Sequence, residues 1–369
     1  MSRPRIALVH DYLTQRGGAE RVVLTLADAY PAATIHTSLY DPEGTFPEFR
    51  DHTVVTSPLD RIGLLRTHHR LALPLLAPAF DHLHVDADVA ICSSSGWAHG
   101  ARVTGAKVVY CYTPARWLYD QRDQYLAGSA GLSSAVIAAM APALRRWDRR
   151  AAATADRYLV SSRVVRDRVA DVYGIAADIV PPPVEIDVTA PARAPAGVAP
   201  GFLLCVSRLL PYKNVGAVEE AVARRPDQRL VVVGAGPLAD ELAATSPSNV
   251  VLLGKVDDAE LRWLYGACLG LVAASYEDFG LTPLEAAAFG RPTAALRWGG
   301  FLDTIVEGET GVLFDEPEPG AIADAVDRLV ATPWSEQALV DHAARYSPDR
   351  FLESVAAVVD EVRAGAQGP

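Results

Sequence analysis

The sequence predicts an α/β fold of two doubly wound domains, each with a parallel sheet between layers of helices. Short apolar runs typical of buried strands alternate with helix-like runs along the whole chain, and this alternation is typical of parallel sheets. A proline-rich break at residues 179–184 divides the chain near its middle. At 369 residues, the chain is long enough for two or three domains.

The first half begins with the strand-like run 5–12, which is apolar enough for a strand buried on both faces. Gly17 and Gly18 follow this run and precede a helix-like run. A glycine turn between a strand and a helix brings backbone N–H groups close to a bound phosphate, although many such turns contain glycine for other reasons. Further strand-like runs lie at 33–40, 53–57, 88–95, 107–113 and 157–162, and a helix-like run covers 132–153.

Three consecutive prolines, Pro181–Pro183, end the first half, because they can continue neither a helix nor a central strand. We expect the linker between the domains in the loop 189–200 that follows, which is rich in alanine and proline. Strand-like runs then recur at 202–209, 229–236, 249–256, 269–275, 293–298 and 311–315. The predicted domains are therefore residues 1–183, joined by a C-terminal helix in 349–369, and residues 184–348.

The bulk composition excludes several classes of function. The net charge is −11 and the pI about 5.3, whereas a general nucleic-acid binder would carry a basic field. The cysteines have no spacing typical of metal ligands or disulfides, and we expect Cys92, Cys111 and Cys205 to be buried thiols. The missing GxGxxG motif argues against a dinucleotide oxidoreductase. Without a secretory signal or a long apolar span, we expect a cytoplasmic protein.

A basic and then apolar stretch lies between residues 64 and 80. Its basic part contains Arg66, His68, His69 and Arg70, and the apolar run 71–80 follows. Such a stretch could contact an anionic membrane or a lipid acceptor. The alternative is a surface helix with a buried continuation. Peripheral contact with the inner face of the membrane is therefore one of two expectations for this stretch.

Cations, glycines and acids follow the ends of five strand-like runs in the second half. Arg208 and Lys213 follow the first run, and two fixed cations suit a diphosphate, although they could also be ordinary surface cations. The next run ends in Gly234 and Gly236, where the backbone is accessible. The run after it ends in Lys255, which adds a charge, and Val256. Because open α/β sheets bind ligands outside the carboxyl ends of their strands, we expect these residues to face one crevice.

Two acids flank the Phe-Gly turn after the fourth of these runs. In the segment SYEDFGLTPLE, seven residues separate Glu277 from Glu285. Thr282, Pro283 and Glu285 also fit the N-cap, N1 and N3 positions of a helix, so Glu285 could be only part of a capping box. Glu277 has no such capping role, which makes it the stronger candidate for a functional acid.

The order of the motifs SRLLPYKN, VVGAGP, LGKV, EDFGLTPLEA and GG resembles that of family 4 glycosyltransferases of the GT-B fold, in which two Rossmann-like domains face a central cleft. In the first half, LVHDYLTQRGGAER, SSSGWAHG, YCYTPARWLYD and RWDRRAA look like the mannosyltransferase-type branch of that family. The resemblance covers nearly the whole chain. It implies an acceptor-side first domain and a donor-binding second domain.

The resemblance also implies a role for each matching position. Arg208 and Lys213 would hold the donor diphosphate and stabilise the charge on the leaving group. Glu277 would bind hydroxyls of the donor sugar, and Glu285 would bind those of the ribose. The remaining donor contacts would come from Gly17 and Gly18, which close over the diphosphate, from Lys255 and Val256 at the base, and from the backbone of Asp278, Phe279, Gly280 and Leu281. No metal or other cofactor is required if the two cations supply the positive charge.

One position departs from the family's pattern. Tyr112 stands in Cys111-Tyr112-Thr113-Pro114, where many relatives have a histidine beside the donor sugar. A tyrosine can donate a hydrogen bond, but it does not act as a base at neutral pH. Either this position only orients the sugar, or His99, which we expect at the accessible end of a strand, contributes instead. A lone histidine is also often structural. Candidates for contact with the acceptor are Arg116 and Asp120.

We therefore predict a retaining, metal-independent hexosyltransferase (EC 2.4.1-type) that uses a nucleotide-diphosphate sugar. The resemblance favours GDP-mannose as donor and a UDP-sugar second, with a glycan, a lipid-linked saccharide or a natural product as acceptor. Because a fold does not determine chemistry, an epimerase or a phosphorylase on the same architecture is an alternative. A catalytically silent sugar-nucleotide-binding protein is another, and the departure at Tyr112 keeps it open.

Overall fold

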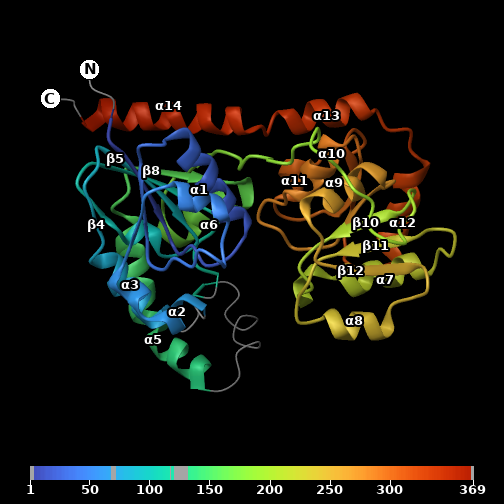
Figure 1. The fold of residues 1–369 in the computed structure, drawn as a ribbon, viewed down its shortest axis with the longest axis horizontal. Coiled ribbons are helices and arrows are strands. Elements are labelled where there is room, and N and C mark those ends of the chain that lie inside the picture. The colour runs from blue at the N-terminus through green and yellow to red at the C-terminus, as the bar shows by residue number, and fades with distance from the viewer. Residues whose placement is uncertain (1–3, 68–71, 117, 120–131, 367–369) are drawn as a thin grey trace. The chain divides into compact units, whose positions relative to one another are not determined.

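A computed structural model describes residues 4–67, 72–116, 118–119 and 132–366, and it divides the chain into two compact units. Unit 1 contains residues 1–182 and 351–369, and unit 2 contains residues 183–350 (Figure 1). These boundaries differ by one or two residues from the predicted domain boundaries. In both units, a parallel sheet carries helices, so the predicted α/β class is confirmed.

Unit 1 is built on a seven-stranded parallel sheet with the strand order β3-β2-β1-β5-β7-β8-β9, and β4 and β6 form a small separate pair. The strands are β1 (Ile6–His10), β2 (Thr34–Thr37), β3 (Val54–Thr56), β4 (His84–Val85), β5 (Val89–Ser94), β6 (Arg102–Val103), β7 (Ala106–Cys111), β8 (Arg157–Val160) and β9 (Asp178–Ile179). The helices are α1 (Gly18–Ala29), α2 (Gly63–Thr67), α3 (Leu73–Asp81), α5 (Leu132–Ala152), α6 (Arg163–Tyr173) and α14 (Pro348–Ala366). Every strand predicted in the first half is present.

Alternate residues of each strand point to opposite faces of the unit 1 sheet. Helices pack on both faces and bury both sets of side chains. In β1, Leu8 packs in one core cluster with α1 and α14, whereas Ala7 and Val9 pack in another with α3, α5 and α6. This arrangement explains why the strand is apolar throughout rather than alternating. The last helix lies in unit 1 from Phe351 onward (Figure 1). Its Phe351 lies edge-on against the ring of Tyr110, with 5.6 Å between ring centroids.

Unit 2 is built on a six-stranded parallel sheet with the order β12-β11-β10-β13-β14-β15. Its strands are β10 (Leu203–Val206), β11 (Leu230–Val233), β12 (Val250–Gly254), β13 (Gly270–Ala273), β14 (Thr293–Leu296) and β15 (Gly311–Phe314). Its helices are α7 (Val215–Ala223), α8 (Ala239–Thr245), α9 (Asp258–Ala267), α10 (Thr282–Ala288), α11 (Phe301–Thr304), α12 (Pro319–Ala331) and α13 (Glu336–Ala344). The strand order reverses beside β10, so β10 and β13 border the switch point where such sheets bind ligands.

The predicted position of the linker is wrong. The chain passes from one unit to the other at Pro182–Pro183, and the loop 189–200 belongs to unit 2. Two contacts fix this loop on α9: the Arg193 backbone N–H donates to the Ala259 carbonyl (3.0 Å), and Arg262 Nε donates to the Pro191 carbonyl (3.0 Å). Its alanines and prolines therefore form an ordered surface segment rather than a flexible connection.

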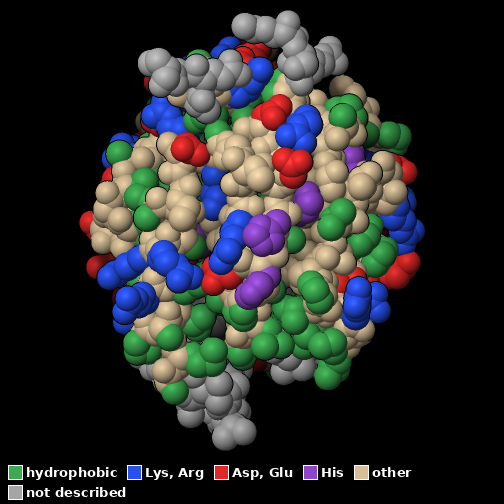
Figure 2. All heavy atoms as spheres, turned by 90° about the vertical axis from the view of Figure 1, so that its left-hand side faces the viewer, with side chains coloured by type: hydrophobic (Ala, Val, Ile, Leu, Met, Phe, Trp, Pro, Cys, Tyr) green, Lys and Arg blue, Asp and Glu red, His purple; other side chains and the backbone are tan. Residues whose placement is uncertain are grey.

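The apolar half of the stretch 64–80 forms α3, which buries Leu76, Ala77 and Phe80 in unit 1. Residues 68–71, which carry part of its basic half, lie outside the described residues. No described helix is both long enough and apolar enough to cross a bilayer. On the face seen in Figure 2, Lys and Arg side chains are interspersed with Asp and Glu. This face therefore lacks the extended basic field of a nucleic-acid binder.

Candidate functional site

The predicted cations of unit 2 lie directly after β10, in a turn that ends in the one-turn helix Pro211–Lys213. Arg208 is exposed, whereas Lys213 is buried. Lys213 Nζ forms an ion pair with Glu277 Oε1. The same carboxylate oxygen accepts from Ser275 Oγ at 2.9 Å. The structure therefore brings together one of the two predicted cations and the stronger candidate acid, one from each side of the switch point.

Tyr212 links the two cations. An Arg208 guanidinium N–H donates to the Tyr212 hydroxyl at 3.0 Å. Lys213 Nζ lies 5.0 Å from the centroid of the same ring, within the range of a cation–π contact. Tyr212 lies in the motif SRLLPYKN, but the motif predicts no role for it, because its two contacts depend on how the turn closes.

Asn214 holds the turn against β13. It is the one non-glycine residue with positive φ (53°) in the described part of the chain, and its side-chain N–H donates to the Ala274 carbonyl at 2.8 Å. Asparagine tolerates the left-handed region better than most residues, because its short polar side chain forms local hydrogen bonds. Asn214 thereby places the preceding Lys213 beside Glu277.

Replacing Asn214 with alanine is expected to destabilise unit 2 by about 2–3 kcal/mol, the sum of a left-handed backbone penalty and a lost hydrogen bond. Asn214→Gly is the matched control, because glycine accepts positive φ and loses only the amide contact, for a cost of about 1 kcal/mol. Urea unfolding of both variants measures the difference. Equal losses in the two variants would show that backbone strain is not what asparagine relieves here.

The Phe-Gly turn after β13 packs tightly against its neighbours. Phe279 is buried, and the Gly300 backbone N–H donates to the Glu277 carbonyl at 2.9 Å. A Cβ on Gly300 would lie 2.1 Å from the Cα of Phe279. Gly280 has φ +83°, and a Cβ there would lie 2.5 Å from the Phe301 ring. The glycines around Glu277 are therefore required by the close approach of backbones and of one ring.

The predicted capping box at Glu285 is wrong. Helix α10 begins at Thr282, its N-cap is Leu281, and no side chain caps it. The Glu285 side chain accepts instead from the Tyr265 hydroxyl of α9, through Oε2 at 2.5 Å. Burial raises the pKa of Tyr265, so its hydroxyl remains a donor. Glu285 is thus held by a neighbouring helix, and its binding of ribose hydroxyls stays a prediction.

The glycines after β11 have a structural explanation. Gly234 has φ +143°, and a Cβ on it would lie 1.8 Å from the carbonyl oxygen of Ser207. A Cβ on Gly236 would lie 2.3 Å from the carbonyl oxygen of Leu209. These glycines thus admit the loop that carries Arg208, and their contact with a base or ribose remains a prediction. After β12, Lys255 is exposed and Val256 is half-buried against the core of unit 2.

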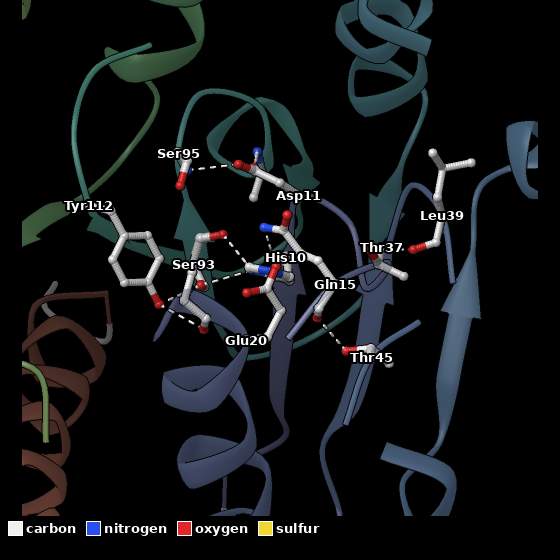
Figure 3. A network of polar contacts seen from close by, with 12 residues as sticks. His10, Asp11, Gln15, Glu20, Thr37, Leu39, Thr45, Ser93, Ser95 and Tyr112 are labelled. Carbon is white, nitrogen blue, oxygen red and sulfur yellow. Dashed lines mark hydrogen bonds and ion pairs between the residues drawn. The ribbon is translucent and has the colours of Figure 1, made fainter. Parts of the chain in front are cut away.

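Unit 1 carries a second cluster of polar side chains at the carboxyl ends of β1, β5 and β7 (Figure 3). His10 Nδ1 lies 3.0 Å from Ser93 Oγ, and His10 Nε2 lies 3.8 Å from Glu20 Oε1. Gln15 Nε2 donates to the same Glu20 oxygen at 3.0 Å. The hydroxyl of Tyr112 lies 3.0 Å from Ser93 Oγ. His10 and Glu20 are both buried. The sequence does not reveal the burial of Glu20, because this residue follows a glycine-rich segment.

Tyr112 is half-buried, and its hydroxyl donates to the Ala19 carbonyl at 3.1 Å. Burial raises its pKa, so it stays protonated and cannot serve as a base near neutral pH. Gly17 is the N-cap of α1, and Gly18 is exposed at the helix start. A Cβ on Gly17 would lie 2.6 Å from Glu20 Oε2, so a larger residue there would require the Glu20 side chain to shift.

Asp11 is a structural acid that the sequence does not single out. Its carboxylate accepts three backbone N–H groups, from Ser95 (2.7 Å), Trp97 (3.2 Å) and Ala98 (2.6 Å). These bonds fix the turn after β5. Burial nevertheless raises the pKa of Asp11, because desolvation penalises the charged form.

The expected accessible position of His99 is wrong. The side chain is 2% exposed, with Nδ1 2.9 Å from Ser94 Oγ and Nε2 3.0 Å from Asp148 Oδ1. The ring of Trp147 in α5 lies 5.6 Å away, centroid to centroid, and helps to cover it. His99 is therefore a core histidine. Arg116 is half-buried, and Asp120 lies outside the described residues.

The stability of unit 1 is expected to depend on pH through His10. Burial lowers the pKa of His10, but Glu20, Asp11 and the Ser93 carbonyl more than offset it, so the net pKa is raised. A raised histidine pKa stabilises the fold fully below the unfolded value of about 6.5, and this stabilisation is lost as pH rises through the folded value. Between pH 6 and pH 9, the wild type should therefore lose stability that Glu20→Gln does not lose. Denaturant unfolding at both pH values measures this difference, and parallel losses in the two proteins would refute the coupling.

The described residues contain no group of three or more His, Cys, Asp or Glu side chains arranged to hold a metal ion. The buried cysteines are free thiols, and burial raises the pKa of Cys92 and Cys205 to about 12. The expectation of buried thiols is therefore confirmed for Cys92, Cys111 and Cys205.

Both halves of the chain are similar to known glycosyltransferases. Residues 16–188 match the family described as Glycosyltransferase Family 4, and residues 192–346 match Glycosyl transferases group 1. The chain is 32% identical over 247 residues to D-inositol 3-phosphate glycosyltransferases of Mycobacterium bovis and Mycobacterium tuberculosis. That match covers 58% of this chain and 51% of each relative, so the chain spans about half the length of these curated relatives.

Solved structures with the same architecture match almost the whole chain. Anabaena HepE in complex with UDP-glucose has a TM-score of 0.69 at 18% identity, over 97% of this chain and 100% of HepE. Sucrose-phosphate synthase from Thermosynechococcus elongatus has a TM-score of 0.71 at 19% identity, over 98% and 100%. At these identities, the likeness shows the fold, and the predicted GT-B architecture of two Rossmann-like domains is confirmed.

Proposed function

We propose that this chain is a family 4-type glycosyltransferase and that it transfers a hexose from a nucleotide-diphosphate sugar to a hydroxyl group of an acceptor. The observation that carries this proposal is the cluster of Arg208, Lys213 and Glu277 at the ends of β10 and β13. It combines two cations with an acid at the switch point of a parallel sheet, where ligands of such sheets bind.

The chemistry requires charge to be stabilised at two places. The bond between the sugar C1 and the phosphate oxygen breaks, C1 bonds to the acceptor oxygen, and the acceptor's hydroxyl proton passes to the departing phosphate oxygen or to solvent. Negative charge grows on the departing diphosphate, where preorganised cations lower the barrier most effectively. Arg208 and Lys213 would supply this charge, so the transfer is proposed to be independent of a metal ion. Glu277 would accept hydrogen bonds from the hydroxyls of the sugar.

Lys213 and Glu277 form an ion pair in which each charge neutralises the other. A diphosphate would compete for the ammonium, and a sugar hydroxyl would then donate to the freed carboxylate. The ammonium thus has an anionic counterpart in the ligand and the carboxylate has a hydrogen-bond donor, which supports a donor containing both a diphosphate and a sugar. The pair also satisfies both groups before binding, so neither is left buried without a partner.

The donor's identity is part of the proposal. The motifs of the first half favour GDP-mannose, whereas the structures of HepE contain UDP-glucose or UDP, which makes a UDP-hexose the second candidate. The matched relatives are named for an inositol phosphate acceptor, so a phosphorylated polyol joins glycans and lipid-linked saccharides as a candidate acceptor. Retention of anomeric configuration is proposed from the family resemblance.

A thermal-shift screen against GDP-mannose, UDP-glucose, ADP-glucose and TDP-glucose tests this proposal. A ligand that binds only the folded state raises the unfolding midpoint, by a free energy that grows with the ratio of its concentration to Kd. One of these nucleotide sugars should raise the unfolding midpoint. The same nucleotide sugar should release its nucleotide when acceptor extract is added. No shift with any of them would refute the proposal, and tight binding without turnover on any extract would instead favour a silent binding protein.

A further inference from the structure

The side chain of Tyr212 contacts both cations of the candidate donor site. Its hydroxyl accepts from Arg208 at 3.0 Å, and its ring faces Lys213 Nζ at 5.0 Å from the centroid. The two cations are otherwise held very differently. Lys213 is buried and paired with Glu277, whereas Arg208 is exposed.

An exposed arginine has many rotamers, and ordering it on a ligand costs conformational entropy. The hydrogen bond to Tyr212 removes part of that cost before the ligand arrives. Tyr212 is itself fixed by its backbone, because its carbonyl accepts from the Tyr276 N–H (3.4 Å) and the turn closes with Lys213 N–H donating to the Leu210 carbonyl (2.9 Å). The Tyr212 backbone is therefore held in place, and its side chain contacts the guanidinium through the hydroxyl and the ammonium through the ring.

We propose that Tyr212 is a positioning residue that fixes the spacing of Arg208 and Lys213 and so makes the site selective for a diphosphate over a monophosphate. This inference deepens the proposed function and rests on it. A diphosphate offers two anionic groups that two cations at a fixed spacing can bind together. A monophosphate offers one, which Lys213 alone can bind, so its affinity does not depend on the spacing.

Tyr212→Phe tests this role, because it removes the hydroxyl and keeps the ring. The Kd values of GDP, UDP, GMP and UMP are measured by calorimetry for wild type and variant. The affinity for the better-bound diphosphate should fall by about fivefold, which is the effect expected when one long side chain loses its prior ordering. The affinity for the matching monophosphate should change by less than about twofold, a split that a merely structural role would not produce.

Tyr346→Phe is the matched control. It also removes a half-buried hydroxyl from unit 2, one that donates to the Asp303 carbonyl at 2.9 Å. The control should leave the ratio of monophosphate to diphosphate Kd unchanged. Unfolding midpoints of both variants without ligand identify any general loss of stability.

A double-mutant cycle then separates direct from indirect action. If Tyr212 acts through Arg208, Tyr212→Phe should have no further effect on diphosphate affinity in an Arg208→Ala background. Equal losses for monophosphate and diphosphate, or an undiminished effect in that background, would overturn the positioning role. A wild type that binds none of GDP, UDP, ADP and TDP would overturn the proposed function together with this inference. Wild-type binding with an unaffected Tyr212→Phe would overturn the inference alone.

Discussion

Replacing Lys213 with alanine is expected to lower the rate of nucleotide release from the donor sugar by about 100- to 1,000-fold, the effect of removing one preorganised group that stabilises charge in the transition state. The ammonium is buried beside Glu277, where its field is screened less than at the surface. Glu277→Ala should reduce turnover to a similar extent, because it removes the proposed sugar contact and leaves the buried Lys213 without its carboxylate. Nucleotide release is measured with the donor identified by the thermal-shift screen.

Arg224→Ala is the control for these variants. Arg224 is an exposed cation of unit 2 whose ion pair with Glu220 lies on the surface of α7, so its removal should change the rate by less than twofold. Turnover of Lys213→Ala within about threefold of the wild type would show that this lysine does not stabilise the leaving group. Unfolding midpoints of all three variants distinguish lost catalysis from lost structure.

Replacing Gly234 with alanine should destabilise unit 2 more than any other single substitution considered. The added Cβ would lie 1.8 Å from the Ser207 carbonyl oxygen, and φ is +143°, a conformation nearly restricted to glycine. Strain and overpacking together should cost about 3 kcal/mol or more, which corresponds to a fall in Tm of roughly 6–12 °C for a unit of this size. Because the loop after β10 must move, donor binding should weaken as well.

Gly254→Ala is the matched control for the steric term. Gly254 also has positive φ (+68°), but nothing lies within 4 Å of an added Cβ. Only the backbone penalty of about 1–2 kcal/mol applies there. Calorimetric unfolding compares the two variants, and a Gly254→Ala protein as unstable as Gly234→Ala would show that contact with Ser207 contributes little.

The secondary structure could be predicted from the sequence because strands buried on both faces leave a strong local signal. The apolar runs at residues 5–12 and 202–209 correspond to β1 and β10, and the helix-like run 349–363 lies in α14. Two local predictions failed where tertiary packing decided the outcome. The loop 189–200 is fixed on α9, and Glu285 turns toward Tyr265 rather than capping its own helix.

The candidate site could be predicted only where a residue's chemistry and its place after a strand agreed. Arg208, Lys213 and Glu277 meet both conditions, and the parallel sheet brings the latter two into contact. His99 meets them as well, but α5 covers it, which no pattern within the motif reveals. The partners of the site, Tyr212, Asn214, Glu20 and Tyr265, depend on how segments distant in sequence approach one another.

The sequence by itself determined the class of the fold, the strands of both sheets and the residues whose charge suits a diphosphate sugar, because hydrophobic periodicity and residue chemistry are local properties. The tertiary structure decided which of those residues are accessible, which are paired and which glycines are required. Those properties depend on distances between segments, such as the approach of the Ser207 carbonyl to Gly234 and of Lys213 to Glu277. Such distances are set by the packing of whole strands and helices, which no single segment of sequence encodes.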